Sequence, residues 1–227
     1  PGIITTHPGT GEAGYSGDGG PAVKAQFKQP HSIQFGPDGS LYVCDIGNHV
    51  IRRIDMKTGL IHPFAGTGKA GATPDGAPIE GTPLKGPRSI DFDLQGSLWL
   101  ATREGNQVFK LDLKAGTIHH IAGTGEKGFT GHGGPAKDAT LSGPKGITVD
   151  KNGNVWLADC ESHSIRMIDT TSGRIELIAG TGEKGDGTST NPLECALARP
   201  HGVFADADGS IYIGDSESHK IRVLRRR

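Results

Sequence analysis

The chain has 227 residues, of which 33% are hydrophobic, and its formal net charge is −1. This length suits a single all-β domain, and a charge so close to zero gives no whole-chain attraction to nucleic acid or to a membrane surface. No apolar run is long enough for a membrane-spanning helix.

In chain order, the first predicted element is a strand over residues 2–6, which a long Gly-rich loop follows. Residues 30–66 then contain short runs of β-branched and aromatic residues, separated by turns such as Asp38-Gly39 and Thr58-Gly59. Runs of this kind with Gly-containing turns are typical of an antiparallel meander. The segment therefore predicts one four-stranded sheet.

The same pattern returns in residues 87–123, 144–180 and 200–224. Its first turn carries a glycine in every copy, and these glycines lie 56 or 57 residues apart: Gly39, Gly96, Gly153 and Gly209. A fixed period of this size predicts a solenoid, a propeller or an array. A four-stranded meander repeated around an axis is a blade of a β-propeller.

The two ends of the chain look complementary. The last copy stops after its third strand, whereas residues 2–6 resemble fourth strands, because Gly-Thr-Gly follows them as it follows the fourth strands of two other copies. We expect residues 2–6 to complete the last blade, which would close a four-bladed ring and remove open sheet edges. Residues 1–227 would then form one domain; the alternative is part of a larger, six-bladed ring.

Three segments resemble NHL repeats: LYVCDIGNHVIRRID, VWLADCESHSIRMID and IYIGDSESHKIRVLR. The loop beginning at Gly9 is similar to the long inter-blade loop of bacterial and teneurin-type NHL propellers. The resemblance covers essentially the whole chain and implies an NHL-type β-propeller. It does not imply one function, because such propellers serve as binding platforms, enzymes and structural modules.

A matched position directly after a loop proline differs between the copies. It is occupied by His31, Arg88, Lys145 and His201. Each of these residues is expected at the start of an inner strand, at the mouth of the central channel and on the face that carries the long loops. Binding residues concentrate on loops held by a rigid scaffold.

Three interpretations of this ring stay open. The Pro-His segments can be plain strand starts. The two cations and two imidazoles can converge on a carboxylate, phosphate or sulfate. The segments also resemble those of peptidylglycine amidating lyase and virginiamycin B lyase, which implies His31 and His201 as ligands of a divalent metal such as zinc. That resemblance is incomplete, because a catalytic zinc normally has three protein ligands.

A second polar set recurs at the turn between the second and third strands of three copies. It pairs an aspartate with a histidine four residues later, in Asp45 and His49, Asp159 and His163, and Asp215 and His219. Because a repeated device is more often structural than catalytic, we expect these pairs to latch the turn through hydrogen bonds. The second copy has Thr102 and Asn106 instead.

The three cysteines cannot all pair within the chain. We expect Cys44 to be a buried thiol. Cys160 and Cys195 are expected on the same face of adjacent structure, so they are the candidate disulfide. Such a bridge would indicate an oxidising compartment, outside the cell or in a periplasm.

The sequence thus predicts a binding module that engages a protein or a small anionic ligand through its loop-rich face and channel mouth, with no nucleic-acid partner. The alternative is a metal-dependent lyase or hydrolase with His31 and His201 as metal ligands. Whether the chain is part of a larger assembly is left open.

Overall fold

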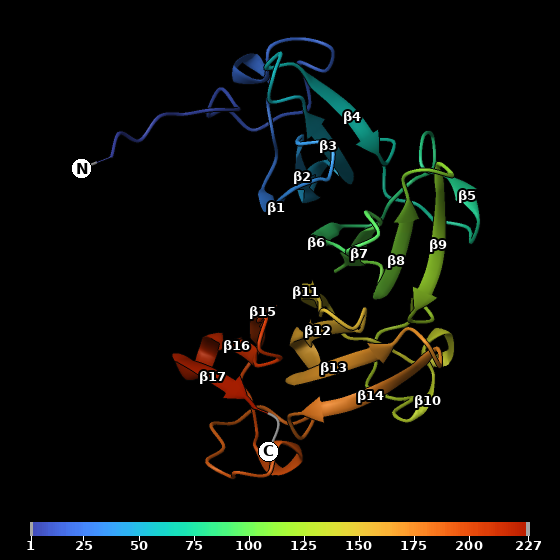
Figure 1. Ribbon diagram of the computed structural model, residues 1–227, viewed down its shortest axis with the longest axis vertical. Helices are drawn as coiled ribbons and strands as arrows, with labels where there is room; N and C mark the ends of the chain where they lie inside the picture. Colours follow the sequence, from blue (N-terminus) through green and yellow to red (C-terminus); the bar gives the residue numbers. More distant parts are fainter. Residues whose placement is uncertain (1, 226–227) are drawn as a thin grey trace.

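The computed structural model describes residues 2–225, and the fold is all-β. Four antiparallel sheets follow one another along the chain and stand around an axis as blades of a β-propeller (Figure 1). The predicted fold class is therefore confirmed. Among the described residues, no helix is long and apolar enough to cross a membrane.

Each of the first three blades is a complete meander, and short strands in the inter-blade loops add an outer edge to two of them. Blade 1 contains β1 (Pro30–Phe35), β2 (Leu41–Asp45), β3 (Val50–Ile54) and β4 (Ile61–Ala65). Blade 2 contains β6 (Pro87–Phe92), β7 (Leu98–Thr102), β8 (Gln107–Asp112), β9 (Thr117–Ala122) and the outer β5 (Ala77–Pro78). Blade 3 contains β11 (Pro144–Val149), β12 (Val155–Asp159), β13 (Ser164–Asp169), β14 (Arg174–Ala179) and the outer β10 (Gly134–Pro135). Blade 4 contains β15 (Pro200–Ala205), β16 (Ile211–Asp215) and β17 (Lys220–Leu224).

The hydrophobic core lies in layers between successive blades. The layer between blades 1 and 2 joins Tyr42 and Ile51 to Leu98 and Phe109, and similar layers follow between the later blades. Both faces of blades 2 and 3 are therefore covered. This is why their second strands, β7 and β12, are buried along their whole length instead of alternating between buried and exposed residues.

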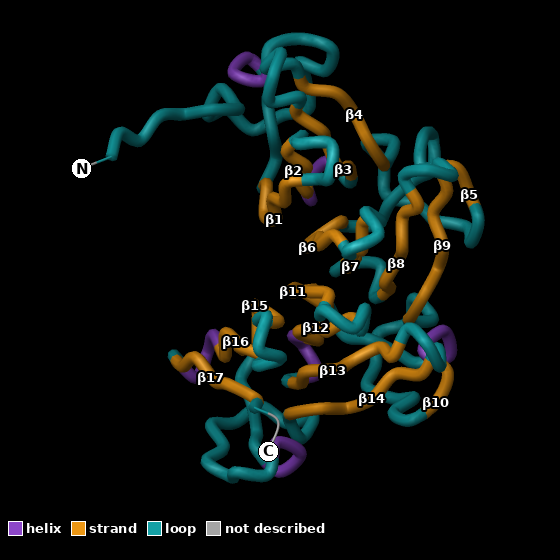
Figure 2. Tube along the Cα trace, in the orientation of Figure 1, coloured by secondary structure: helices purple, strands orange, loops and turns teal. Residues whose placement is uncertain are grey.

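Short 3-10 turns connect the second and third strands of blades 1, 3 and 4: η2 (Ile46–Asn48), η4 (Cys160–Ser162) and η6 (Ser216–Ser218). Each of these turns ends at a histidine in the left-handed conformation, with φ between 52° and 55°. Three further turns lie in the inter-blade loops: η1 (Ala22–Lys24), η3 (Ala136–Asp138) and η5 (Pro192–Glu194). Figure 2 shows these long loops on the outside of the blades.

The predicted closure of the ring does not form. Residues 2–6 make no strand, and blade 4 has three strands. Ile3 and Ile4 are 92% and 99% exposed, and the N-terminal segment runs away from the blades at the open side of the arc (Figure 1). The similarity of residues 2–6 to fourth strands does not lead to pairing. To pair, these residues would have to reach β17 across the opening between blades 1 and 4. The alternative of a larger ring remains a prediction.

Apolar residues on the two sides of this opening are exposed, although the matched residues of other blades are more buried. Ile51 on β3 and Ile165 on β13 are fully buried, whereas Ile221 at the same position of β17 is 76% exposed. On the other side, Ile33 and Phe35 of β1 are also exposed. The position is apolar in each blade because it forms an inter-blade layer, and at blade 4 no described residue covers it.

Buried arginines connect the third strands to the long loops. Arg52 is fully buried and donates to the backbone oxygens of Gln26 and Ser16 and to the carboxylate of Asp18. Arg166, also fully buried, donates to the backbone oxygens of Thr140 and Thr130. Arg222, which is only partly buried, contacts the corresponding loop through Gly187 and Asp186. These arginines satisfy loop carbonyls that would otherwise be buried without a partner.

Candidate functional site

The four inner strands begin with the same backbone device. The residue before each loop proline has a positive φ, which is 56° at Gln29, 67° at Gly86, 60° at Gly143 and 47° at Arg199. The residue after the proline is skipped in the pairing with the second strand, so it forms a β-bulge. The bulged residues are His31, Arg88, Lys145 and His201. Bulges change the direction of a side chain and are common beside functional sites.

Three of these bulges are anchored by the preceding blade. The backbone N–H of Gly86 donates to His49 Nδ1 at 3.2 Å, and that of Arg199 donates to His163 Nδ1 at 3.1 Å. Between blades 2 and 3, the N–H of Gly143 donates to Asn106 Oδ1 at 2.9 Å. Asparagine therefore replaces histidine as the acceptor in blade 2. His219 has no such partner among the described residues.

The aspartates of the predicted latch pairs bind elsewhere. Asp45 Oδ1 accepts from Lys28 N, Asp159 Oδ1 from Ser142 N and Asp215 Oδ1 from Ala198 N, each at 2.7 Å. Their other oxygens face the buried arginines: Asp159 Oδ2 lies 3.6 Å from Arg166. Aspartate and histidine of one turn thus make separate contacts, the first to the incoming loop and the second to the next blade.

The structure brings three of the four bulged residues together at the channel mouth. Lys145 is 8% exposed, and its Nζ lies 2.9 Å from His201 Nε2. The pKa of the His201 imidazole is lowered by burial first, and then by the charges of Lys145 and Arg88. We call Arg88, Lys145 and His201 the rim cluster. Because its pKa lies below the ordinary value of 6.5, the His201 imidazole is mostly neutral at pH 7, and its Nε2 accepts a hydrogen bond from the Lys145 ammonium.

Arg88 carries the least compensated charge of this cluster. It is half-buried, and it makes no hydrogen bond or ion pair with any residue in the described range. Burial lowers its pKa, and the nearby guanidinium of Arg103 lowers it further, against an opposite effect of Cys44. Arg103 likewise has no acidic partner among residues 2–225. Neither arginine therefore forms an ion pair with a carboxylate of residues 2–225.

Acidic groups do approach the other side of the cluster. Glu161 Oε1 lies 3.7 Å from Lys145 Nζ and 2.5 Å from Arg199 Nη2, and Arg199 Nη1 lies 2.8 Å from Glu217. An open depression of about 500 Å³ adjoins these residues, and its charged lining residues are Arg103, Lys127, Arg199, Glu104 and Glu161. Glu161 and Glu217 are engaged by Arg199, and no carboxylate in the described part of the chain pairs with Arg88.

His31 is not part of the cluster. It is exposed, and its Nδ1 donates to the backbone oxygen of Gln29 at 2.8 Å. Figure 1 shows β1 and β15 on opposite sides of the opening in the arc. The convergence of His31 with His201 was expected for a closed ring and does not occur in this open one.

The residues do not fit the predicted metal site. Within residues 2–225 there is no group of three histidine, cysteine or acidic side chains that could hold a metal ion. The Lys145 ammonium stands at the Nε2 lone pair of His201, and a positive charge there opposes a cation. A catalytic zinc normally has three protein ligands, and the rim cluster does not supply them.

The predicted disulfide is also absent. All three cysteines are free and buried. The Cys195 Sγ contacts the Gly187 carbonyl at 3.5 Å, whereas the Cys160 Sγ contacts Glu161. The disulfide was expected because Cys160 and Cys195 were placed on the same face of the propeller. That placement does not determine the distance between their sulfur atoms. The prediction that Cys44 is a buried free thiol is confirmed. Because no disulfide forms, the expected extracellular or periplasmic location is no longer supported by one, and it remains a prediction.

Sequence reasoning missed the buried arginines. Their signal was present, because Arg52, Arg166 and Arg222 occupy one matched position. Blade 2 has Phe109 there and also Thr102 in place of the aspartate. The two charges are lost together, as expected when each would be buried without the other.

Comparisons with known proteins show which families and structures the chain is similar to. The teneurin NHL domain model matches residues 113–196, and the NHL repeat model matches residues 197–224. Residues 113–224 are thus similar to NHL-type repeats. Human NHL repeat-containing protein 2 is 26% identical over 97% of this chain, and the Arabidopsis thaliana protein SUPPRESSOR OF QUENCHING 1, chloroplastic, is 28% identical over 95%. The chain spans 34% of the length of the human protein and 21% of the length of the plant protein.

Solved structures share the β-propeller fold of this chain. An auxiliary nutrient binding protein from Bacteroides thetaiotaomicron has a TM-score of 0.68 at 19% identity, over 88% of this chain and 48% of that one. Virginiamycin B lyase from Staphylococcus aureus has a TM-score of 0.57 at 21% identity, over 87% of this chain and 52% of that one. At such identities these likenesses show the architecture alone.

Proposed function

We propose that this NHL propeller is a binding module whose rim cluster takes an anionic group, from either a small molecule or an acidic side chain of a protein. NHL propellers commonly act as interaction modules, and one structural neighbour is described as a nutrient binding protein. The proposal is carried by one observation: Arg88 is half-buried, lies near Arg103 and has no acidic partner among the described residues. A half-buried guanidinium without a partner favours an incoming carboxylate or phosphate.

The bulge geometry supports the same proposal. Arg88 and Lys145 stand at matched positions on neighbouring inner strands, and each backbone is fixed by a hydrogen bond from the preceding blade. Because the inner strands are held in place, little backbone order has to be gained when an anion binds. His201 extends the site, since its imidazole can take up a proton when negative charge arrives.

The experiment is a calorimetric titration of the purified chain with inorganic phosphate and, separately, with citrate. Arg88→Ala with Lys145→Ala should weaken binding about tenfold or more, because two charge-assisted contacts are lost. The matched control is Arg174→Ala with Lys69→Ala, which removes the same charge at exposed sites outside the cluster.

Unchanged affinity in the Arg88 and Lys145 variant, with its circular dichroism spectrum preserved, would show that the rim cluster does not bind these anions. Equal weakening in the control variant would mean that the chain attracts anions only through its overall charge. Either result would favour the first interpretation of the sequence, in which the residues after the loop prolines only begin the inner strands.

A further inference from the structure

The packing between blades 1 and 2 provides an internal reference for the packing between blades 2 and 3. In the first interface, Tyr42 packs edge-on against Phe64 and Phe92, with ring centroids 4.9 Å and 5.2 Å apart. The matched residues of the second interface are Trp99, Ile121 and Val149. Two phenyl rings are thus replaced by aliphatic side chains, while the central aromatic residue is kept.

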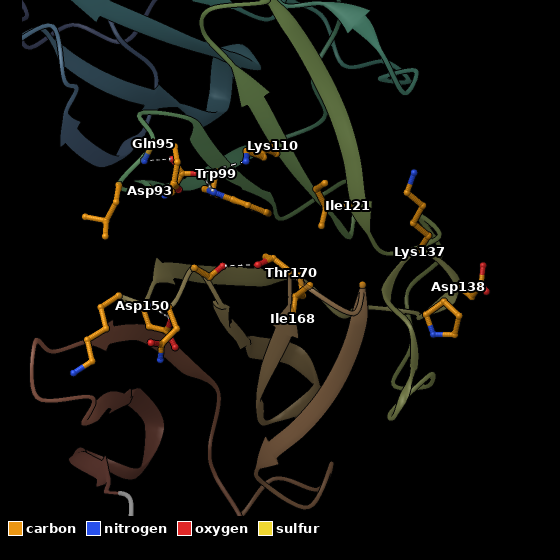
Figure 3. A pocket seen from close by; sticks show the side chains of 16 residues that line it. Asp93, Gln95, Trp99, Lys110, Ile121, Lys137, Asp138, Asp150, Ile168 and Thr170 are labelled. Atoms are coloured by element: carbon orange, nitrogen blue, oxygen red, sulfur yellow. Dashed lines mark hydrogen bonds and ion pairs between the residues drawn. The ribbon is translucent and has the colours of Figure 1, made fainter.

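A pocket of about 760 Å³ lies in this second interface (Figure 3). Its apolar wall includes Trp99 and Ile121 from blade 2 and Ile168 from blade 3, and Figure 3 shows the two isoleucines facing each other across the pocket. Pockets of about 300–1,000 Å³ with apolar walls and a few polar groups are typical of small-molecule sites. The pocket is on the side of the short turns, such as Asp93–Gly96, and not on the side of the rim cluster.

The carboxylates at the mouth of the pocket are engaged inside the protein. Asp93 accepts from the backbone N–H groups of Gln95 and Ser97 and from the Trp99 indole. Asp150 is satisfied in the same way by its own turn and by the indole of Trp156. These two buried acids therefore offer few free acceptors to a ligand.

A cation stands beside the apolar wall. Lys110 Nζ lies 5.4 Å from the centroid of the Trp99 ring and 3.4 Å from Asp93 Oδ2. Asp138 also lines the pocket, but Figure 3 shows it at the outer end, away from Lys110. The inner part of the pocket thus combines an indole and two isoleucines with the Lys110 ammonium, which is paired with the Asp93 carboxylate.

We propose that this pocket binds a small molecule with a flat apolar ring system and one anionic group. The ring system would lie between Trp99, Ile121 and Ile168, next to the positions that match Phe64 and Phe92 of the other interface, and the anionic group would lie beside Lys110. This site is separate from the rim cluster, and its test does not depend on anion binding there.

The probe is naphthalene-2-sulfonate, with 2-naphthyltrimethylammonium as the matched cation. Binding is followed by the fluorescence of Trp99 in a Trp156→Phe background, since the chain has two tryptophans. Ile121→Phe with Val149→Phe copies the filled interface and should lower the affinity for the sulfonate about tenfold or more. Lys110→Met should lower the affinity for the sulfonate about fivefold, and it should leave the affinity for the cation unchanged or raise it.

The reciprocal variant Phe64→Ile with Phe92→Val keeps the test decisive if the filled variant does not fold. It should open a matching cavity between blades 1 and 2 and raise the number of sulfonate molecules bound per chain. Sulfonate affinity that survives filling of the pocket, or no additional bound probe in the opened variant, would overturn the proposal. Equal affinity for the sulfonate and the cation would overturn the role of Lys110.

Discussion

The imidazole Nδ1 of His163 accepts a hydrogen bond from the backbone N–H of Arg199 at 3.1 Å, and so joins the turn of blade 3 to the first strand of blade 4. The same contact joins His49 to Gly86. Because His163 has a φ of 52° and Arg199 has a φ of 47°, both backbones are held in conformations that need support. The contact therefore stabilises the interface and the bulge beside it.

His163→Ala should lower the free energy of unfolding by about 1–3 kcal/mol, because the Arg199 N–H loses its acceptor. His163→Asn should retain most of the stability, since Asn106 makes the equivalent contact in blade 2. His219→Ala is the matched control, with the same left-handed backbone and no partner among the described residues. Urea unfolding measures all three, and equal losses at His163 and His219 would show that only the backbone conformation matters.

Arg166 and Asp159 should behave as one unit. Arg166→Phe alone leaves a buried carboxylate and two loop carbonyls without their partner, so we expect a loss of about 3–5 kcal/mol. Adding Asp159→Thr, as in blade 2, should recover part of this loss. A double-mutant cycle measures the coupling, and strictly additive losses would contradict a shared role.

His201 should respond to a bound anion. Burial and the charges of Lys145 and Arg88 lower its pKa below the ordinary value of 6.5. An anion at the rim cluster would offset those charges, so phosphate should raise the pKa, as measured by NMR titration of the imidazole protons. A pKa that does not move at saturating phosphate would place the anion elsewhere.

The same shift has a consequence for stability. Below pH 6.5 the unfolded chain takes up a proton at His201 more readily than the folded chain does, so stability should fall as the pH drops from 6.5 through the folded pKa. His201→Gln should flatten this part of the stability profile. Identical profiles for the two proteins would contradict the lowered pKa.

Glu217 should contribute to stability in a more acidic range. Hydrogen bonds from Lys184 and Arg199 lower the pKa of Glu217 to about 2 from its ordinary value of 4.5. This stabilising effect is complete above pH 4.5 and is lost as the pH falls from 4.5 to about 2. Glu217→Gln should therefore lose less stability than the parent chain over that range, as measured by thermal unfolding. An unchanged acid profile would show that this exposed ion pair is screened by solvent.

All three thiols should be available for alkylation after unfolding without a reductant, since none is in a disulfide. In the folded protein they should react slowly, because all three are buried and burial raises the pKa values of Cys44 and Cys160. Mass spectrometry counts the labels. One label on the unfolded, unreduced chain would show that two cysteines are paired.

Local and periodic features of the sequence determined the blades. The turn glycines, such as Gly39, need a positive φ, and the alternating apolar residues between them need a sheet with covered faces. Both properties depend on neighbours within a few residues, so they are visible in the sequence. The repeat length then determined that matched residues share a structural role, which the common bulge at Arg88 and Lys145 illustrates.

Only the tertiary structure decided which of these residues meet. The angle between blades leaves residues 2–6 unpaired and separates His31 from His201, while Lys145 and His201 come within 2.9 Å. The distance between Cys160 and Cys195 and the pocket beside Trp99 were likewise decided by packing between blades. These outcomes depend on the summed contacts of side chains about 57 residues apart, and the sequence of one blade contains no information about the angle at which the next one packs.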